Sequence, residues 1–85
     1  MTEQEKQMTR DRIGLRILTL RKMQQLTQEE LAGRAGIDRG HLSRIEAGKY
    51  AVTLETVEAI AKALGMTVDI IDERMRDLAP LRVLT

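Results

Sequence analysis

Arg39, His41 and Arg44 bring three basic side chains into one short segment, "DRGHLSRIE". Arginine carries a planar fork of N–H donors that matches a phosphate or the O6 and N7 acceptors of guanine. His41 is the only histidine and the chain has no cysteine, so a metal site or a histidine-dependent triad has almost no residues to use. The segment is therefore suited to recognition by hydrogen bonding, and we expect no metal, no cofactor and no enzyme active site.

The excess of basic residues lies in the same half of the chain as this segment. Residues 1–50 carry ten Lys/Arg and seven Asp/Glu, whereas residues 51–85 carry four and six, although the net charge of the 85 residues is only +1. A basic excess around the segment suits a nucleic-acid partner. Tyr50 is the only aromatic residue, which argues against single-stranded nucleic acid bound by base stacking. With no membrane-length apolar run and no secretion signal, we expect a cytoplasmic protein.

The apolar spacing predicts helices and a single domain over residues 1–85 with its core in residues 9–66. A first helix is expected over residues 9–25, with an apolar face made by Ile13, Ile17, Leu20 and Leu26 and widened by Leu15, Leu18 and Met23. Thr53 caps a later helix that Gly65 ends, and its apolar face is made by Leu54, Val57, Ile60, Ala61 and Leu64. The expected fold class is all-α, a compact bundle of four to five helices.

Two short helices are predicted between these longer ones. Thr27 followed by Glu30 is a capping box that starts one helix, and Gly36 ends it. Asp38 caps the next helix, which Gly48 ends. The pair is a helix-turn-helix, whose second helix lies in the DNA major groove in proteins that use it. The residues expected to face outward from that second helix are Arg39, Gly40, His41, Ser43 and Arg44.

Residues 67–85 are ambiguous in pattern. Val68, Ile71 and Leu78 keep helical spacing after a possible cap at Thr67, whereas the β-branched run "TVDII" also allows a short strand. The surplus apolar residues need a buried surface, and we expect some of them to face a second copy across a two-fold axis. The interface residues predicted on this argument are Val68, Ile70, Ile71 and Leu78.

The segment "TQEELAGRAGIDRGHLSRIEAGK", with "LETVEAIAKALGM" after it, resembles the phage-repressor and Cro-like (XRE-type) helix-turn-helix family over residues 13–66. The resemblance implies a lambda-repressor-like bundle that binds operator DNA as a dimer. It also implies base contacts from Arg39, Gly40, His41 and Arg44, with Ser43 on the same face. Gly40 departs from the commonest pattern, since glycine offers no side chain to a base.

The same resemblance implies further roles at matching positions. Gln28 is expected to contact a phosphate from the start of the second helix, and Lys49 and Tyr50 to do so from the loop after the third. Arg21 and Glu46 match an ion pair that ties the first helix to the third. These two residues are expected to be structural.

The prediction from sequence is a sequence-specific, double-stranded DNA-binding transcriptional regulator. We expect a repressor that acts as a homodimer on a pseudo-palindromic operator, with recognition helices roughly 34 Å apart. The alternative is an antitoxin, or a controller of restriction–modification genes, whose tail binds a partner protein such as a toxin. An enzyme is a poor third hypothesis, because no nucleophile–base pair or phosphate-binding loop is visible.

Overall fold

The computed structural model describes residues 1–71, which form four α-helices and one short 3₁₀ helix. The elements are α1 (Glu3–Met23), α2 (Gln28–Ala35), α3 (Arg39–Glu46), α4 (Leu54–Ala63) and η1 (Val68–Ile70). No strand occurs within residues 1–71. The all-α prediction is therefore confirmed for this part of the chain, and the β-branched run forms a 3₁₀ turn rather than a strand.

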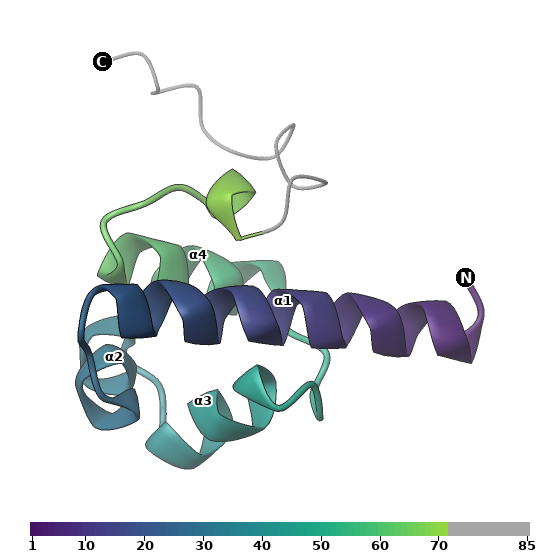
Figure 1. Ribbon diagram of the computed structural model, residues 1–85, viewed down its shortest axis with the longest axis horizontal. Helices are drawn as coiled ribbons and strands as arrows, with labels where there is room; N and C mark the ends of the chain where they lie inside the picture. The colour runs from purple at the N-terminus through teal and green to yellow at the C-terminus, as the bar shows by residue number, and fades with distance from the viewer. Residues whose placement is uncertain (72–85) are drawn as a thin grey trace.

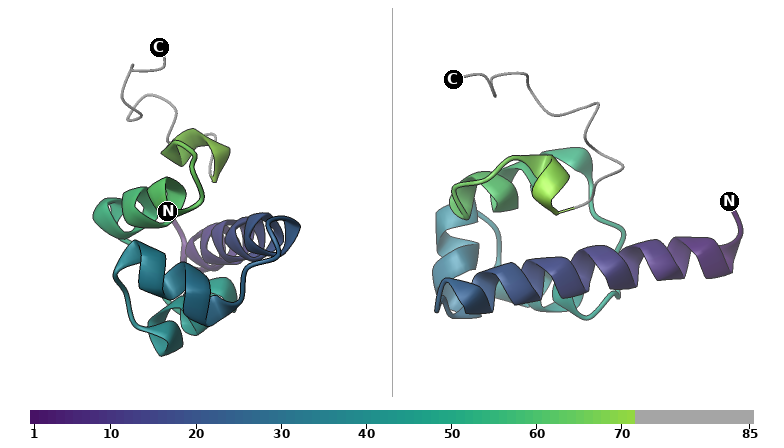
Figure 2. Two further views of the ribbon diagram at one scale, coloured as in Figure 1. Left: turned by 90° about the vertical axis from the view of Figure 1, so that its left-hand side faces the viewer. Right: turned by 45° about the horizontal axis from the view of Figure 1, so that its top comes forward.

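Helix α1 runs across the molecule between α3 and α4, and α2 lies at its C-terminal end (Figure 1). Helix α1 packs on α3, while α2 packs on both α3 and α4. The first turns of α1 project beyond the other helices, as the right-hand view in Figure 2 also shows. The core fills the space between the four helices. Its largest fully buried side chains are Ile17, Leu31, Leu42, Ile45, Val57, Ile60 and Ile71.

Helix α1 starts earlier than the predicted position near Thr9. Thr2 and Glu5 form a capping box, in which the Thr2 hydroxyl accepts from the Glu5 N–H and the Glu5 carboxylate accepts from the Thr2 N–H. Residues 3–12 carry no apolar stripe, so this start depends on the cap rather than on packing. Residues 13–20 bury the predicted face, but Leu15 is 62% exposed and Met23 is 73% exposed, so neither widens the core.

The other helix boundaries follow the capping residues that the sequence contains. Thr27, Asp38 and Thr53 each accept a backbone N–H of the first helical turn. Gly36 ends α2 in the left-handed conformation, at φ 72°, which glycine adopts without strain. These predictions were correct because side-chain caps are local interactions that the order of the residues alone can reveal.

Gly14 sets the close approach between α1 and α3. A Cβ atom at this position would overlap the backbone carbonyl oxygens of Ile45 and Glu46, the second at 2.8 Å. Neither oxygen can move independently of α3, so the crossing of the two helices depends on the missing side chain. The C-terminal end of α3 is therefore fixed against α1, and this contact sets the position of the whole helix.

Candidate nucleic-acid interface

Helix α3 separates an apolar inner face from a polar outer face. Leu42 and Ile45 are fully buried. The five residues predicted to face outward all keep exposed surface, most of all Arg39 and Arg44, whereas Gly40, His41 and Ser43 are partly buried. The sequence pattern therefore identified the free face of α3 correctly. The base-contacting roles of these residues stay predictions.

The start of α3 is fixed by two local features. The N–H of Ile37 donates to the Ala32 carbonyl at 3.0 Å, which closes the turn after α2. Asp38 then accepts the N–H of His41 at 3.2 Å. These bonds hold the first turn of α3, which contains Arg39 and Gly40, in place after the turn that joins α2 to α3.

His41, Arg44 and Tyr50 form a cluster on this outer face, here called the Tyr50 cluster. The rings of His41 and Tyr50 have centroids 5.5 Å apart with planes tilted by 43°. The Arg44 guanidinium carbon lies 5.2 Å from the Tyr50 ring centroid, a cation–π distance. The sequence placed Tyr50 in a phosphate-contacting loop and gave no sign of this contact with α3.

The predicted ion pair between Arg21 and Glu46 is present and buried. Arg21 donates from Nε at 2.7 Å and from a terminal nitrogen at 2.9 Å to the two carboxylate oxygens of Glu46. Its other terminal nitrogen donates to the Leu26 carbonyl at 2.8 Å. The hydrogen bonds to Glu46 raise the pKa of Arg21 above its ordinary value, against the opposing effect of burial.

Gln28 joins this pair rather than pointing only to solvent. Its side-chain amide donates to Glu46 at 3.0 Å, so Glu46 accepts hydrogen bonds from both α1 and α2. We call Arg21, Gln28 and Glu46 the buried polar centre. The predicted phosphate contact of Gln28 is untested, but any such contact has to coexist with this internal hydrogen bond.

The predicted interface residues at the end of the described chain fall into two groups. Val68 and Ile71 are buried in the core of a single copy, which corrects the expectation that they face a second one. Their side chains fill the space beside α4 that the first four helices leave open. Ile70 is 39% exposed and keeps its apolar surface. Leu78 lies outside the described residues.

Gln7, which the sequence analysis did not single out, anchors the loop between α3 and α4. The side-chain amide of Gln7 donates to the Gly48 carbonyl and to the Asp11 carboxylate, both at 2.8 Å. Gln7 was missed because the predicted first helix began after it. The capping box at Thr2 and Glu5 was the available signal, because it brings Gln7 onto α1.

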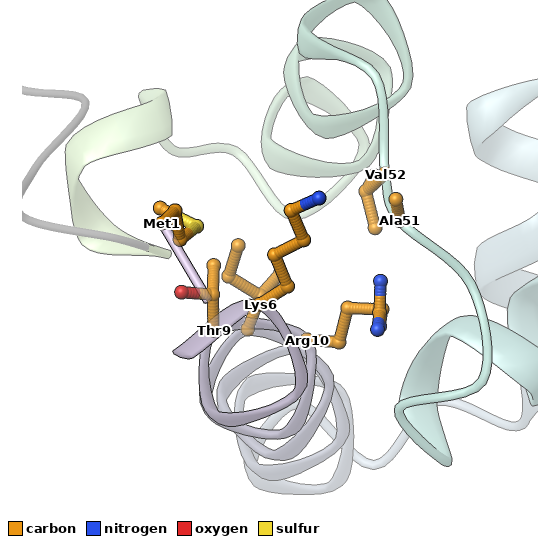
Figure 3. Close-up of a pocket in the computed structure, with 7 residues that line it drawn as sticks. Met1, Lys6, Thr9, Arg10, Ala51 and Val52 are labelled. Carbon is orange, nitrogen blue, oxygen red and sulfur yellow. The ribbon is translucent and has the colours of Figure 1, made fainter. Parts of the chain in front are cut away.

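A groove of about 240 Å³ lies between the first half of α1 and the loop after Tyr50 (Figure 3). Lys6 and Arg10 stand at its edge beside Ala51 and Val52. Within residues 1–71 there is no group of three or more histidine or acidic side chains that could hold a metal ion. None of the helices described there combines the length and apolar character needed to cross a membrane.

A short helix that packs against a preceding helix and presents a basic outer face is the arrangement of a helix-turn-helix DNA-binding protein. Comparison with known proteins agrees, since the helix-turn-helix family HTH_3 matches residues 17–71. The chain belongs to this family. Proteins of this helix-turn-helix family bind DNA.

Three similar proteins illustrate the range of the family. The immunity repressor protein of Bacillus phage phi105 is 44% identical over 59 residues, covering 69% of this chain and 41% of the repressor. Antitoxin PezA of Streptococcus pneumoniae is 42% identical over 62 residues, covering 72% of this chain and 39% of the antitoxin. The chain thus matches well under half the length of both relatives.

The third is a solved structure, the restriction-modification controller protein C.AhdI from Aeromonas hydrophila. It superimposes with a TM-score of 0.73 at 30% identity, covering 74% of this chain and 96% of the controller. The superposition thus covers nearly the whole controller and about three quarters of this chain.

Proposed function

We propose that the outer face of α3 reads a specific double-stranded operator and that the protein represses transcription by occupying it. The observation that supports this most is the contrast on α3, where Leu42 and Ile45 are fully buried while Arg39 and Arg44 are exposed. Both arginines can donate two parallel hydrogen bonds to guanine O6 and N7. The proposed role is binding rather than catalysis, in the cytoplasm, where the DNA would be available.

We assign base contacts to Arg39, His41, Ser43 and Arg44, and phosphate contacts to Lys49 and to the N-terminus of α2 at Gln28. Lys49 is exposed in the loop directly after α3. Its N–H donates to the Arg44 carbonyl at 2.9 Å, which keeps the loop beside the outer face. Phosphate contacts of this kind fix the position of a protein on DNA without reading its sequence.

We further propose that the protein acts as a homodimer, because a two-fold pair of recognition helices suits a pseudo-palindromic operator. Ile70 offers exposed apolar surface near the end of the described chain. The molar mass from light scattering checks this proposal. A monomer at high micromolar concentration without DNA would contradict it.

The test of the function is binding to the DNA immediately upstream of the gene against random duplex of equal length, over a range of salt concentrations. We expect a large preference for the upstream DNA and a steep fall of both affinities with salt. Arg39→Ala should weaken specific binding by roughly 1–3 kcal/mol, whereas Lys49→Ala should weaken both duplexes alike and flatten the salt dependence. Weak and equal binding of the wild-type protein to both duplexes would overturn the proposal.

A second candidate function is that of an antitoxin, which the similarity to antitoxin PezA favours. In that case a toxin would be encoded beside this gene, and the two proteins would form a complex. Co-expression with the product of the neighbouring gene, followed by size-exclusion chromatography, tests this. Separate elution of the two proteins would argue against it.

A further inference from the structure

The guanidinium of Arg44 has a defined position although it is exposed. Among the described residues its side chain makes no hydrogen bond or ion pair, and its contact is the face of the Tyr50 ring, 5.2 Å from the guanidinium carbon. All of its N–H donors therefore remain available to an acceptor outside the protein. A cation–π contact restrains the plane of a guanidinium while leaving its edge, which carries the donors, open.

Tyr50 is restrained by a ring contact and by the bonding of its loop, although it is 42% exposed. Its ring contacts the His41 ring, with centroids 5.5 Å apart. Its backbone follows a turn at Gly48, where φ is +75° and the carbonyl accepts a hydrogen bond from Gln7 on α1 at 2.8 Å. The Lys49 N–H closes the loop onto the Arg44 carbonyl at 2.9 Å. The ring therefore contacts α3 through both His41 and Arg44, and it stands on a loop that is hydrogen-bonded to α1 and α3.

Gly40 lies next to this guanidinium without determining its position. A Cβ atom at position 40 would lie 3.4 Å from one terminal nitrogen of Arg44, an ordinary van der Waals distance, and 2.9 Å from an Asp38 carboxylate oxygen. The closer contact is thus with the residue that caps α3. The side chain that restrains Arg44 is therefore Tyr50.

We propose that Tyr50 is a specificity-determining positioning residue, which acts by holding the Arg44 guanidinium in one orientation on the outer face of α3. The proposal rests on the proposed function, since it concerns how Arg44 meets a base pair. An arginine that is already oriented loses less side-chain entropy on binding. It also presents its two parallel donors in one plane, which favours a bidentate acceptor such as guanine over other bases.

The first experiment needs no DNA. In the full chain, NMR should find the Arg44 side-chain protons shifted upfield by the ring current of Tyr50. Tyr50→Leu should abolish this shift, and Tyr50→Phe, the matched control, should keep it because it keeps the ring. An Arg44 shift that is absent in the wild type, or unchanged in Tyr50→Leu, would overturn the proposal.

The second experiment measures specificity on the preferred duplex, selected from a randomised pool with the wild-type protein. Arg44→Ala identifies the base pair that Arg44 reads, as the position at which this variant no longer discriminates. The quantity compared is the ratio of the affinity for the preferred duplex to the affinity for a duplex changed at that base pair. This ratio should be roughly two- to fivefold lower in Tyr50→Leu than in the wild type. Tyr50→Phe should keep the ratio, because it keeps the ring. In an Arg44→Ala background, Tyr50→Leu should have no further effect on it.

The outcomes separate this proposal from the proposed function. If Tyr50→Phe and Tyr50→Leu weaken all duplexes equally, Tyr50 acts as a phosphate contact through its hydroxyl, and the positioning role is overturned while DNA binding stands. If the wild-type protein selects no sequence from the pool, both the proposed function and this inference fail. Circular dichroism of each variant confirms that the helices are retained.

Discussion

Arg21 and Arg44 show how the same residue type serves opposite purposes in one small molecule. In the buried polar centre, Arg21 uses its donors on Glu46 and the Leu26 carbonyl. In the Tyr50 cluster, Arg44 rests on an aromatic face and keeps its donors open. Glu46 and Arg44 are only two residues apart on α3, so the helix connects a fixed internal anchor to an outward-facing group. The difference indicates that the first arginine stabilises the fold and the second is available for binding.

The largest expected effect comes from removing the acceptor of the buried polar centre. Glu46→Ala leaves the Arg21 guanidinium buried without its partner, and breaking a buried pair in this way costs roughly 3–5 kcal/mol. Urea unfolding followed by circular dichroism measures it. Arg44→Ala is the matched variant in the Tyr50 cluster and should change stability by no more than about 0.5 kcal/mol.

The comparison fails if these two variants destabilise the protein equally. That result would mean that the exposed cluster contributes to the fold as much as the buried centre does. A Glu46→Ala protein that does not fold at all would still agree with the prediction, provided that Arg44→Ala folds normally.

A smaller effect is expected from adding a methyl group at the crossing of α1 and α3. Gly14→Ala forces a Cβ against the backbone of Ile45 and Glu46, and overpacking of this kind costs about 1–3 kcal/mol. Gly33→Ala, in open space on α2, should stabilise the protein by about 0.5–1 kcal/mol because alanine is the better helix residue. Thermal unfolding of both variants measures the two changes, which should have opposite signs.

The smallest effect concerns the carboxylate of Glu30, which is exposed and therefore contributes little to the stability of the fold. The Thr27 backbone N–H, and then its hydroxyl, hold the pKa of Glu30 below its ordinary value of 4.5. A lowered pKa in the folded state stabilises the protein above pH 4.5, and this contribution disappears as the pH falls through the folded value. The stability difference between wild type and Glu30→Gln should therefore vanish in strong acid.

Glu29→Gln is the control for this measurement, since it removes the same charge one residue away from the cap. Its stability difference from the wild type should change less between neutral and acidic pH. Equal pH dependence of the two variants would show that the Thr27 hydrogen bonds do not govern Glu30.

Local signals in the sequence were enough to predict most of the fold. Thr27, Asp38 and Thr53 mark helix starts because capping bonds join residues close in sequence. The early start of α1 was missed because residues 3–12 have no apolar periodicity. The burial of Val68 and Ile71 was missed because it depends on the space that the other helices leave.

The site was predictable only in part, for the same physical reason. The outward face of α3 followed from the burial of Leu42 and Ile45, which periodicity reveals. The partners of Gln28 and Tyr50 did not, because the first contacts Glu46 across 18 residues and the second contacts α3 from a following loop. Such contacts depend on tertiary packing and leave no mark in the spacing of residue types.

The buried polar centre also has a consequence for the order of folding. Glu46 accepts from Arg21 across 25 residues and from Gln28 across 18, so all of its hydrogen bonds form only once α1, α2 and α3 have docked. Interactions completed late in folding mainly slow unfolding and have little effect on the rate of folding. We therefore expect Glu46 to determine how long α3 stays in place once formed, rather than how quickly the chain reaches its native state.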